Sequence, residues 1–239
     1  MTYAVSAIWR FPVKSMGGES LTEVALDTRG LVGDREWAVY DAAGKLASGK
    51  MTSRFRRMDP VFALAAETLP NGGGIDIVLP SGERVRAGEG RADVALSEHF
   101  GEEVEVAPES DVQHQDAGQV SLVGSATLDE LARLHGLDAP LDVRHLRANL
   151  VVDTDEPFLE ESWVGRELAF GATLDAATVV LRVVERIERC RMVDLAQVEV
   201  AEVDGLLRTI SDQRNLCTAV YADVVTAGTV RIGDVVVPR

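Results

Sequence analysis

The sequence is short of several residue types, and each shortage excludes a class of protein. Only two cysteines occur, Cys190 and Cys217, too few for a zinc site or an iron–sulfur cluster held by four thiolates. A structural disulfide is also unexpected in a reducing compartment. The four histidines are scattered, at positions 99, 114, 135 and 145, so no multi-histidine metal site is indicated.

Long apolar runs and positive charge are scarce as well. No run approaches the roughly 20 apolar residues that a membrane-spanning helix needs, and residues 1–10 lack the pattern of a signal peptide. We therefore expect a cytoplasmic protein without a membrane partner. Lysine and arginine number 24 against 39 aspartates and glutamates, which gives a formal net charge of −15. Because such a surface repels nucleic acid, we expect no nucleic-acid partner.

What is present is a series of short β-forming segments separated by Gly, Asn, Asp and Pro. Helices are predicted at residues 125–134 and within 198–209, with hairpin turns at 41–44 and 71–74. The predicted strands lie at 3–11, 21–27, 36–40, 61–68, 75–79, 146–152, 167–170, 174–184, 218–225, 229–232 and 235–237. This pattern predicts a mainly β or α+β fold with barrel-like sheets and a few short helices.

A polar loop at residues 105–119 contains Pro108 and follows the β-rich N-terminal part of the chain. We place a domain boundary there, with one domain at 1–107 and the other at 108–239. Neither domain contains a phosphate-binding loop of the Lys-Ser or Lys-Thr type, a Gly-x-Ser-x-Gly elbow or a His-Glu-x-x-His pair.

Two N-terminal segments carry donors that suit an anion. Lys14 and Ser15 follow a proline and precede two glycines, and a plain surface turn is the alternative. Arg35 lies between Asp34 and Glu36-Trp37, where its planar guanidinium suits a phosphate. A surface pair with Asp34 is the alternative there.

Two C-terminal segments complete the set. Arg147 and Asn149 are two residues apart in a predicted strand, so their side chains should point to the same side, unless this is a solvated edge strand. Cys190 stands among Arg186, Arg189 and Arg191, and cationic neighbours favour the thiolate that binds metals. A buried, inert cysteine is the alternative, and it suits Cys217 better.

Taken in order along the chain, these segments resemble the MOSC family, named for the C-terminal domain of molybdenum cofactor sulfurases, with its N-terminal β-barrel domain at 1–107 and the MOSC domain at 108–239. Further matching stretches lie at 48–60, 116–124, 161–165, 207–209 and 228–234. Ala148 stands where the family often has proline. The resemblance covers nearly the whole chain, and it is the ordered set that is specific.

The resemblance implies the fold and the site. It implies a MOSC-type β-barrel that binds the molybdenum cofactor, a molybdopterin whose dithiolene sulfurs hold the metal, with Cys190 as the metal ligand and catalytic residue. The cofactor-binding residues implied by motif position are Lys14, Ser15, Arg35, Ser121, Arg147, Asn149, Arg189 and Cys190. The family is also associated with pyridoxal phosphate.

Two functions follow from the resemblance. The first is a molybdenum-dependent oxidoreductase, similar to amidoxime-reducing proteins, that reduces small N-hydroxylated compounds. Because the sequence lacks the cysteines of a ferredoxin domain, we expect electrons from a separate flavin or ferredoxin-type protein. The second is a sulfur or cofactor carrier using a Cys190 persulfide. The complete set of pocket residues favours the enzyme, and Asp116 is a candidate proton carrier by position alone.

Overall fold

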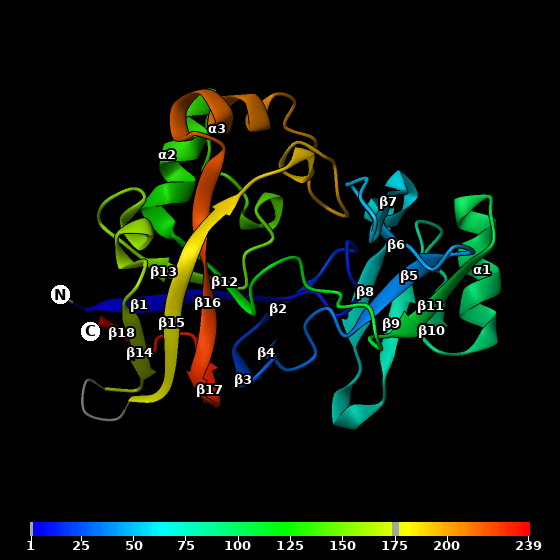
Figure 1. Ribbon diagram of the computed structural model, residues 1–239, viewed down its shortest axis with the longest axis horizontal. Coiled ribbons are helices and arrows are strands. Elements are labelled where there is room, and N and C mark those ends of the chain that lie inside the picture. The colour runs from blue at the N-terminus through cyan, green and yellow to red at the C-terminus, as the bar shows by residue number, and fades with distance from the viewer. Residues whose placement is uncertain (1, 174–176) are drawn as a thin grey trace.

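The first strand, β1 (Tyr3–Arg10), closes a barrel by pairing on both of its edges (Figure 1). It runs antiparallel to β13 (Leu150–Asp153) on one side and to β18 (Val235–Pro238) on the other. The circuit continues through the remaining strands in the order β13, β12 (Val120–Gly124), β16 (Cys217–Thr226), β15 (Ala177–Glu188), β14 (Glu167–Gly171) and β18. The computed structural model describes residues 2–173 and 177–239, and the predicted strand at 174–184 starts outside them.

The barrel interior is filled by β-branched and leucine side chains from alternate positions of its strands. Ile8, Leu122 and Leu181 are all fully buried there. Branched side chains fit a pleated, two-sided surface because their first torsion angle is already restricted. A short strand, β2 (Glu19–Leu21), pairs antiparallel with the C-terminal end of β1. A small sheet of β3 (Glu23–Asp27), β4 (Gly30–Leu31) and β17 (Gly228–Arg231) adjoins the barrel.

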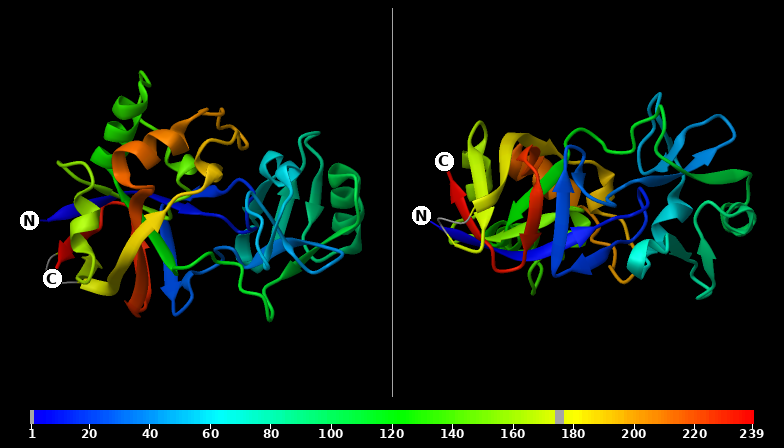
Figure 2. Two further views of the ribbon diagram at one scale, coloured as in Figure 1. Left: turned by 45° about the horizontal axis from the view of Figure 1, so that its top comes forward. Right: turned by 90° about the horizontal axis from the view of Figure 1, so that it is seen from below.

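A smaller lobe, with its own apolar core, lies beside the barrel in every view (Figures 1 and 2). It contains two further sheets and helix α1 (Gly90–Phe100). One sheet orders its strands as β11 (Val104–Pro108), β5 (Trp37–Asp41), β6 (Leu46–Ser48) and β7 (Phe55–Arg57), and the other as β10 (Arg84–Arg86), β9 (Ile75–Val78) and β8 (Ala65–Thr68). The mainly β fold class is confirmed, and the boundary at 107/108 stays a prediction.

The two longer helices of the barrel lobe cover its upper end in Figure 1. Helix α2 (Ser125–His135) matches the predicted 125–134. Helix α3 (Leu206–Arg214) starts later than predicted, because Gly205 adopts a left-handed conformation and residues 197 and 200 form a bridge before it. Short 3-10 turns lie at η1 (Asp59–Ala63), η2 (Pro70–Gly72), η3 (Val143–His145), η4 (Leu159–Trp163) and η5 (Arg191–Val193). No helix in residues 2–173 and 177–239 is long and apolar enough to cross a membrane.

Glu160, in η4, is a fully buried carboxyl outside any predicted site. The Thr127 hydroxyl donates a hydrogen bond of 2.9 Å to its Oε2, while its Oε1 has no partner. Burial raises the pKa of Glu160 to about 7. The folded protein therefore retains a proton at a pH where the unfolded chain has lost it.

Replacing Glu160 by Gln tests this consequence. Since the folded pKa is raised, stability is highest below the unfolded value of 4.5 and falls as the pH rises to about 7. Glu160→Gln should remove that slope and, at about 1.4 kcal/mol per pKa unit, stabilise the protein by up to about 3.5 kcal/mol at pH 8. Urea unfolding of both proteins at pH 5 and pH 8 measures this. Glu161→Gln is the control and should destabilise, because Glu161 pairs with Arg186 and Arg214; parallel pH curves for Glu160→Gln and wild type would refute the assignment.

Candidate functional site

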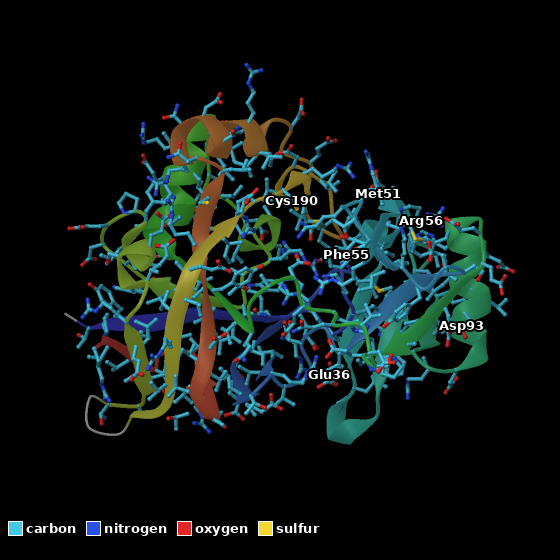
Figure 3. The ribbon with its side chains drawn as sticks, in the orientation of Figure 1. Glu36, Met51, Phe55, Arg56, Asp93 and Cys190 are labelled. Carbon is cyan, nitrogen blue, oxygen red and sulfur yellow. The ribbon has the colours of Figure 1, made fainter. Side chains whose placement is uncertain are left out.

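A pocket enclosing about 830 Å³, open mouth included, lies where the barrel meets the smaller lobe. Figure 3 shows Cys190 on the side of the barrel lobe that faces Met51 and Phe55 of the smaller lobe. All eight residues named from the sequence line this pocket: Lys14, Ser15, Arg35, Ser121, Arg147, Asn149, Arg189 and Cys190.

Three of the lining residues have left-handed backbones although none is glycine. The φ angles are 68° at Ser15, 54° at Arg35 and 50° at Arg147. This conformation costs an ordinary residue about 1–2 kcal/mol, and such strain gathers where function requires a particular geometry. Arg147 precedes β13 rather than lying in it, so the same-side strand argument for Arg147 and Asn149 was wrong. The two side chains reach one pocket because the backbone turns between them.

Arg35 and Arg147 share the ring of Phe11. Their guanidinium carbons lie 5.1 Å and 4.1 Å from its centroid, close enough for cation–π attraction. Arg35 also pairs with Asp34 and donates a 3.2 Å hydrogen bond to the carbonyl of Arg147. The alternative prediction of an Asp34–Arg35 ion pair is therefore correct, but the pair lies buried beside the pocket and not at the surface.

The Arg147 guanidinium is only partly satisfied. Its Nη1 donates to the carbonyl of Met16 at 2.7 Å and to Gln197 Oε1 at 3.2 Å, whereas its Nη2 is buried without a partner. Burial, with the nearby charge of Arg35, lowers the pKa of Arg147 to about 9. An unpaired buried donor on a cation is costly unless a ligand supplies the acceptor.

A second group of cations surrounds Asp116. Its carboxylate oxygens lie 2.9 Å from Lys14 Nζ and 3.0 Å from Lys50 Nζ. Burial lowers the pKa of Lys14 to about 8 against the opposing effect of Asp116. Burial alone would raise the pKa of Asp116, but the two lysines hold it far below its usual range. The ring of Phe55 lies 4.7 Å from Lys14 Nζ and 5.7 Å from Lys50 Nζ.

Ser121 and Asn149 brace the ends of two parallel barrel strands, β12 and β13, at the pocket wall. Asn149 Oδ1 accepts from the Ser121 hydroxyl at 2.8 Å and from the Ser121 backbone N–H at 3.1 Å. Asn149 Nδ2 donates to the carbonyl of Trp9 at 3.2 Å. Their polar groups therefore serve the protein's own framework beside the pocket.

Cys190 is partly exposed and directly precedes η5. The Arg189 guanidinium donates to the carbonyl of Leu146, and His145 Nδ1 lies 2.8 Å from the carbonyl of Val193, so the turn is fixed on both sides of the thiol. Of the three neighbouring arginines only Arg189 lines the pocket. Arg186 pairs with Glu161 at 2.8 Å and Arg191 with Asp59 at 2.7 Å. The second cysteine, Cys217, does not line the pocket.

The sequence arguments missed several lining residues. Lys50 lies within the 48–60 stretch that carried the resemblance but was not singled out, and Asp116 was placed only by its neighbours. Tyr221 projects from the middle of β16, where only the alternation of the strand could have indicated its direction. Two more lining side chains, Gln115 and Glu188, had no motif to mark them.

The lining combines an excess of positive charge with a single thiol. Five basic side chains (Lys14, Arg35, Lys50, Arg147 and Arg189) face two acidic ones (Asp116 and Glu188). The unpaired Nη2 of Arg147 needs an acceptor, and the partly exposed thiol of Cys190 is a soft ligand. In the described parts of the chain, no group of three or more His, Cys, Asp and Glu side chains is placed to hold a metal ion.

Comparison with known proteins finds one similar sequence and one similar fold of note. In the zebrafish Danio rerio, the protein named molybdenum cofactor sulfurase is 27% identical over 255 aligned positions, covering 86% of this chain. The chain spans only 30% of that relative's length. The crystal structure of the YUAD protein from Bacillus subtilis has the same fold, with a TM-score of 0.53 at 15% identity over 99% of this chain and 94% of that one.

Two family models together match nearly the whole chain. The MOSC N-terminal beta barrel domain matches residues 2–117, and the MOSC domain matches residues 109–237. The second match alone covers more than half of the 239 residues. The chain therefore belongs to the MOSC domain family.

Proposed function

We propose that the protein binds the molybdenum cofactor in this pocket and reduces small N-hydroxylated compounds with it. The observation that carries the proposal is the unpaired Nη2 of Arg147, buried in a lining with excess positive charge beside the thiol of Cys190. Molybdopterin joins the two ligand types that such a lining requires, because it carries a phosphate and holds a thiophilic metal.

The chain's residues divide this work. Arg35, Arg147 and Lys14 would hold the phosphate through charge-assisted hydrogen bonds, and the thiolate of Cys190 would bind the metal. The bound cofactor would supply two-electron redox chemistry at molybdenum. Ser121 and Asn149 would keep the strand ends in place. Pyridoxal phosphate, also associated with the family, stays a prediction that no contact favours over molybdopterin.

Reduction of an N-hydroxyl group consumes two electrons and two protons and releases water. The electrons would come from a separate flavin or ferredoxin-type protein. Asp116 is unsuited to donate a proton, since two lysines hold it as a carboxylate.

The alternative is a sulfur or cofactor carrier. It is favoured by the likeness to a relative named molybdenum cofactor sulfurase, of which this chain spans the smaller part. Cys190 would then hold a persulfide, and no organic substrate would turn over. A partly exposed thiol beside an arginine suits this chemistry too.

Metal content tests the cofactor and its ligand. The protein purified from a host that makes the cofactor should contain molybdenum and pterin in equal amounts, measured by elemental analysis and pterin fluorescence. Cys190→Ser should lose at least about tenfold of the molybdenum, since a hydroxyl is a poor ligand for a soft metal. The matched control, Cys217→Ser, should keep it. Wild-type protein without molybdenum would refute the proposal. A Cys190→Ser protein with as much molybdenum as the wild type would refute the assignment of Cys190 as the metal ligand.

Turnover separates the enzyme from the carrier. Loaded protein should reduce benzamidoxime or hydroxylamine when a flavin reductase or a reduced ferredoxin supplies electrons, and Cys190→Ser should lose at least about tenfold of kcat, in proportion to the metal that it loses. Fully loaded protein that turns over neither compound, but carries a cyanide-labile sulfur on Cys190, would favour the carrier.

The pH dependence of anion binding tests the cationic pocket without the cofactor. Sulfate suits this test because its charge is constant from pH 6 to 10. Its affinity for the cofactor-free protein should fall by up to about tenfold as the pH rises through 8, where Lys14 loses its proton. Calorimetry at pH 7 and 9 measures this. Lys14→Met should bind sulfate weakly with a smaller pH step, and Lys45→Met, outside the pocket, should match the wild type. A wild type with equal affinity at both pH values would count against Lys14.

A further inference from the structure

The fully buried His114 and the partly buried Tyr40 form a hydrogen-bonded pair beside the pocket wall. His114 is fully buried, and its Nε2 lies 2.6 Å from the Tyr40 hydroxyl. Its Nδ1 lies 3.0 Å from the carbonyl of Arg35, and its backbone N–H donates to Glu109 at 2.7 Å. Neither His114 nor Tyr40 lines the pocket, and neither belongs to a motif that the proposed function uses.

The partners of the imidazole ring determine which nitrogen carries its proton. A backbone carbonyl can only accept, so Nδ1 must carry the hydrogen that binds the Arg35 carbonyl. Nε2 is then the acceptor and the Tyr40 hydroxyl the donor. Burial lowers the pKa of His114 to about 4 and raises that of Tyr40, so both side chains are neutral near pH 7.

The carbonyl held by His114 belongs to a strained residue. Arg35 has a φ of 54°, a conformation that the surrounding contacts must maintain. Its backbone N–H donates to the carbonyl of Phe11 at 2.8 Å, and His114 holds the carbonyl end. Because both ends of the residue are fixed, the guanidinium is directed over Phe11 toward Arg147.

The same histidine also lies two residues before Asp116. Its hydrogen bond therefore ties the segment that carries Asp116 to the segment that carries Arg35, and so links the two cation groups of the pocket. We propose that His114, whose tautomer is set by the Tyr40 hydroxyl, is a positioning residue: its Nδ1 holds the Arg35 backbone in the left-handed conformation so that the pocket accepts an anion. This inference rests on the proposed anion-binding role of Arg35.

Two amide substitutions separate the roles of the two ring nitrogens. The amide nitrogen of Asn takes the place of Nδ1, so His114→Asn retains a donor to the Arg35 carbonyl and loses Tyr40. His114→Gln extends its amide toward Tyr40 and lacks that donor. His135 provides the matched control, since its Nδ1 lies 2.9 Å from the Thr209 hydroxyl, away from the pocket.

The probe is inorganic phosphate, titrated calorimetrically at pH 7 into full-length protein made without the cofactor. His114→Asn should bind phosphate within about threefold of the wild type, and His114→Gln about tenfold more weakly, since it loses the bond that fixes Arg35. His135→Asn and His135→Gln should both match the wild type. If His114→Asn and His114→Gln lose phosphate affinity equally, the Nδ1 donor does not position Arg35. That result would overturn the proposal.

A spectroscopic measurement on wild-type protein does not depend on any variant folding. Nitrogen-15 shifts of the His114 ring should show a protonated Nδ1 and an unprotonated Nε2 at pH 7, and Tyr40→Phe should shift the Nε2 signal. A protonated Nε2 with a bare Nδ1 would overturn the proposal. If the wild-type protein binds no phosphate, the anion pocket and this inference are both contradicted. If the wild-type protein and both His114 variants bind phosphate equally well, only the positioning role of His114 is contradicted.

Discussion

The pocket gathers five positively charged side chains at the junction of the two lobes, and the structure around it depends on compensating their charge. Each cation removed from water loses hydration, and five of them repel one another. The protein offsets this with the rings of Phe11 and Phe55, the carboxylates of Asp34 and Asp116, and backbone carbonyls such as that of Met16. The compensation is incomplete at Arg147, and that incompleteness is what leaves the pocket able to accept an anion.

The two lobes supply these compensating groups from different parts of the chain. Strand β1 carries the backbone out of the barrel, and the residues after it, Phe11 to Ser15, cross to the smaller lobe. Lys14 and Lys50 approach from that side, whereas Arg147, Arg189 and Cys190 follow elements of the barrel lobe. Asp116 lies on the segment that returns to the barrel. The pocket is therefore a property of the junction between the lobes.

How much of this could be predicted from the sequence differs by feature. The β-rich character and helix α2 were accessible from the residue pattern, and the eight pocket residues were accessible from their motif positions in the family resemblance. The start of α3 could not be predicted, because the sequence pattern does not show that Gly205 has a left-handed φ angle. The directions of Arg186 and Arg191 were also inaccessible, because they depend on Glu161 and Asp59, which are distant in sequence. The pair of Tyr40 and His114 spans 74 positions and has no local signature.

The double pairing of β1 has a consequence for synthesis on the ribosome. Tyr3 pairs with Val236 in β18, so β1 cannot be paired on both of its edges until all the other barrel strands have emerged. The sheets of the smaller lobe, by contrast, draw all their strands from residues 37–108 and can form while translation continues. The barrel is thus closed late, because the edge of β1 that pairs with β18 stays open for about the time needed to translate 230 residues, some tens of seconds at typical elongation rates. An edge of that length, rich in apolar residues, is a natural binding site for chaperones during this interval.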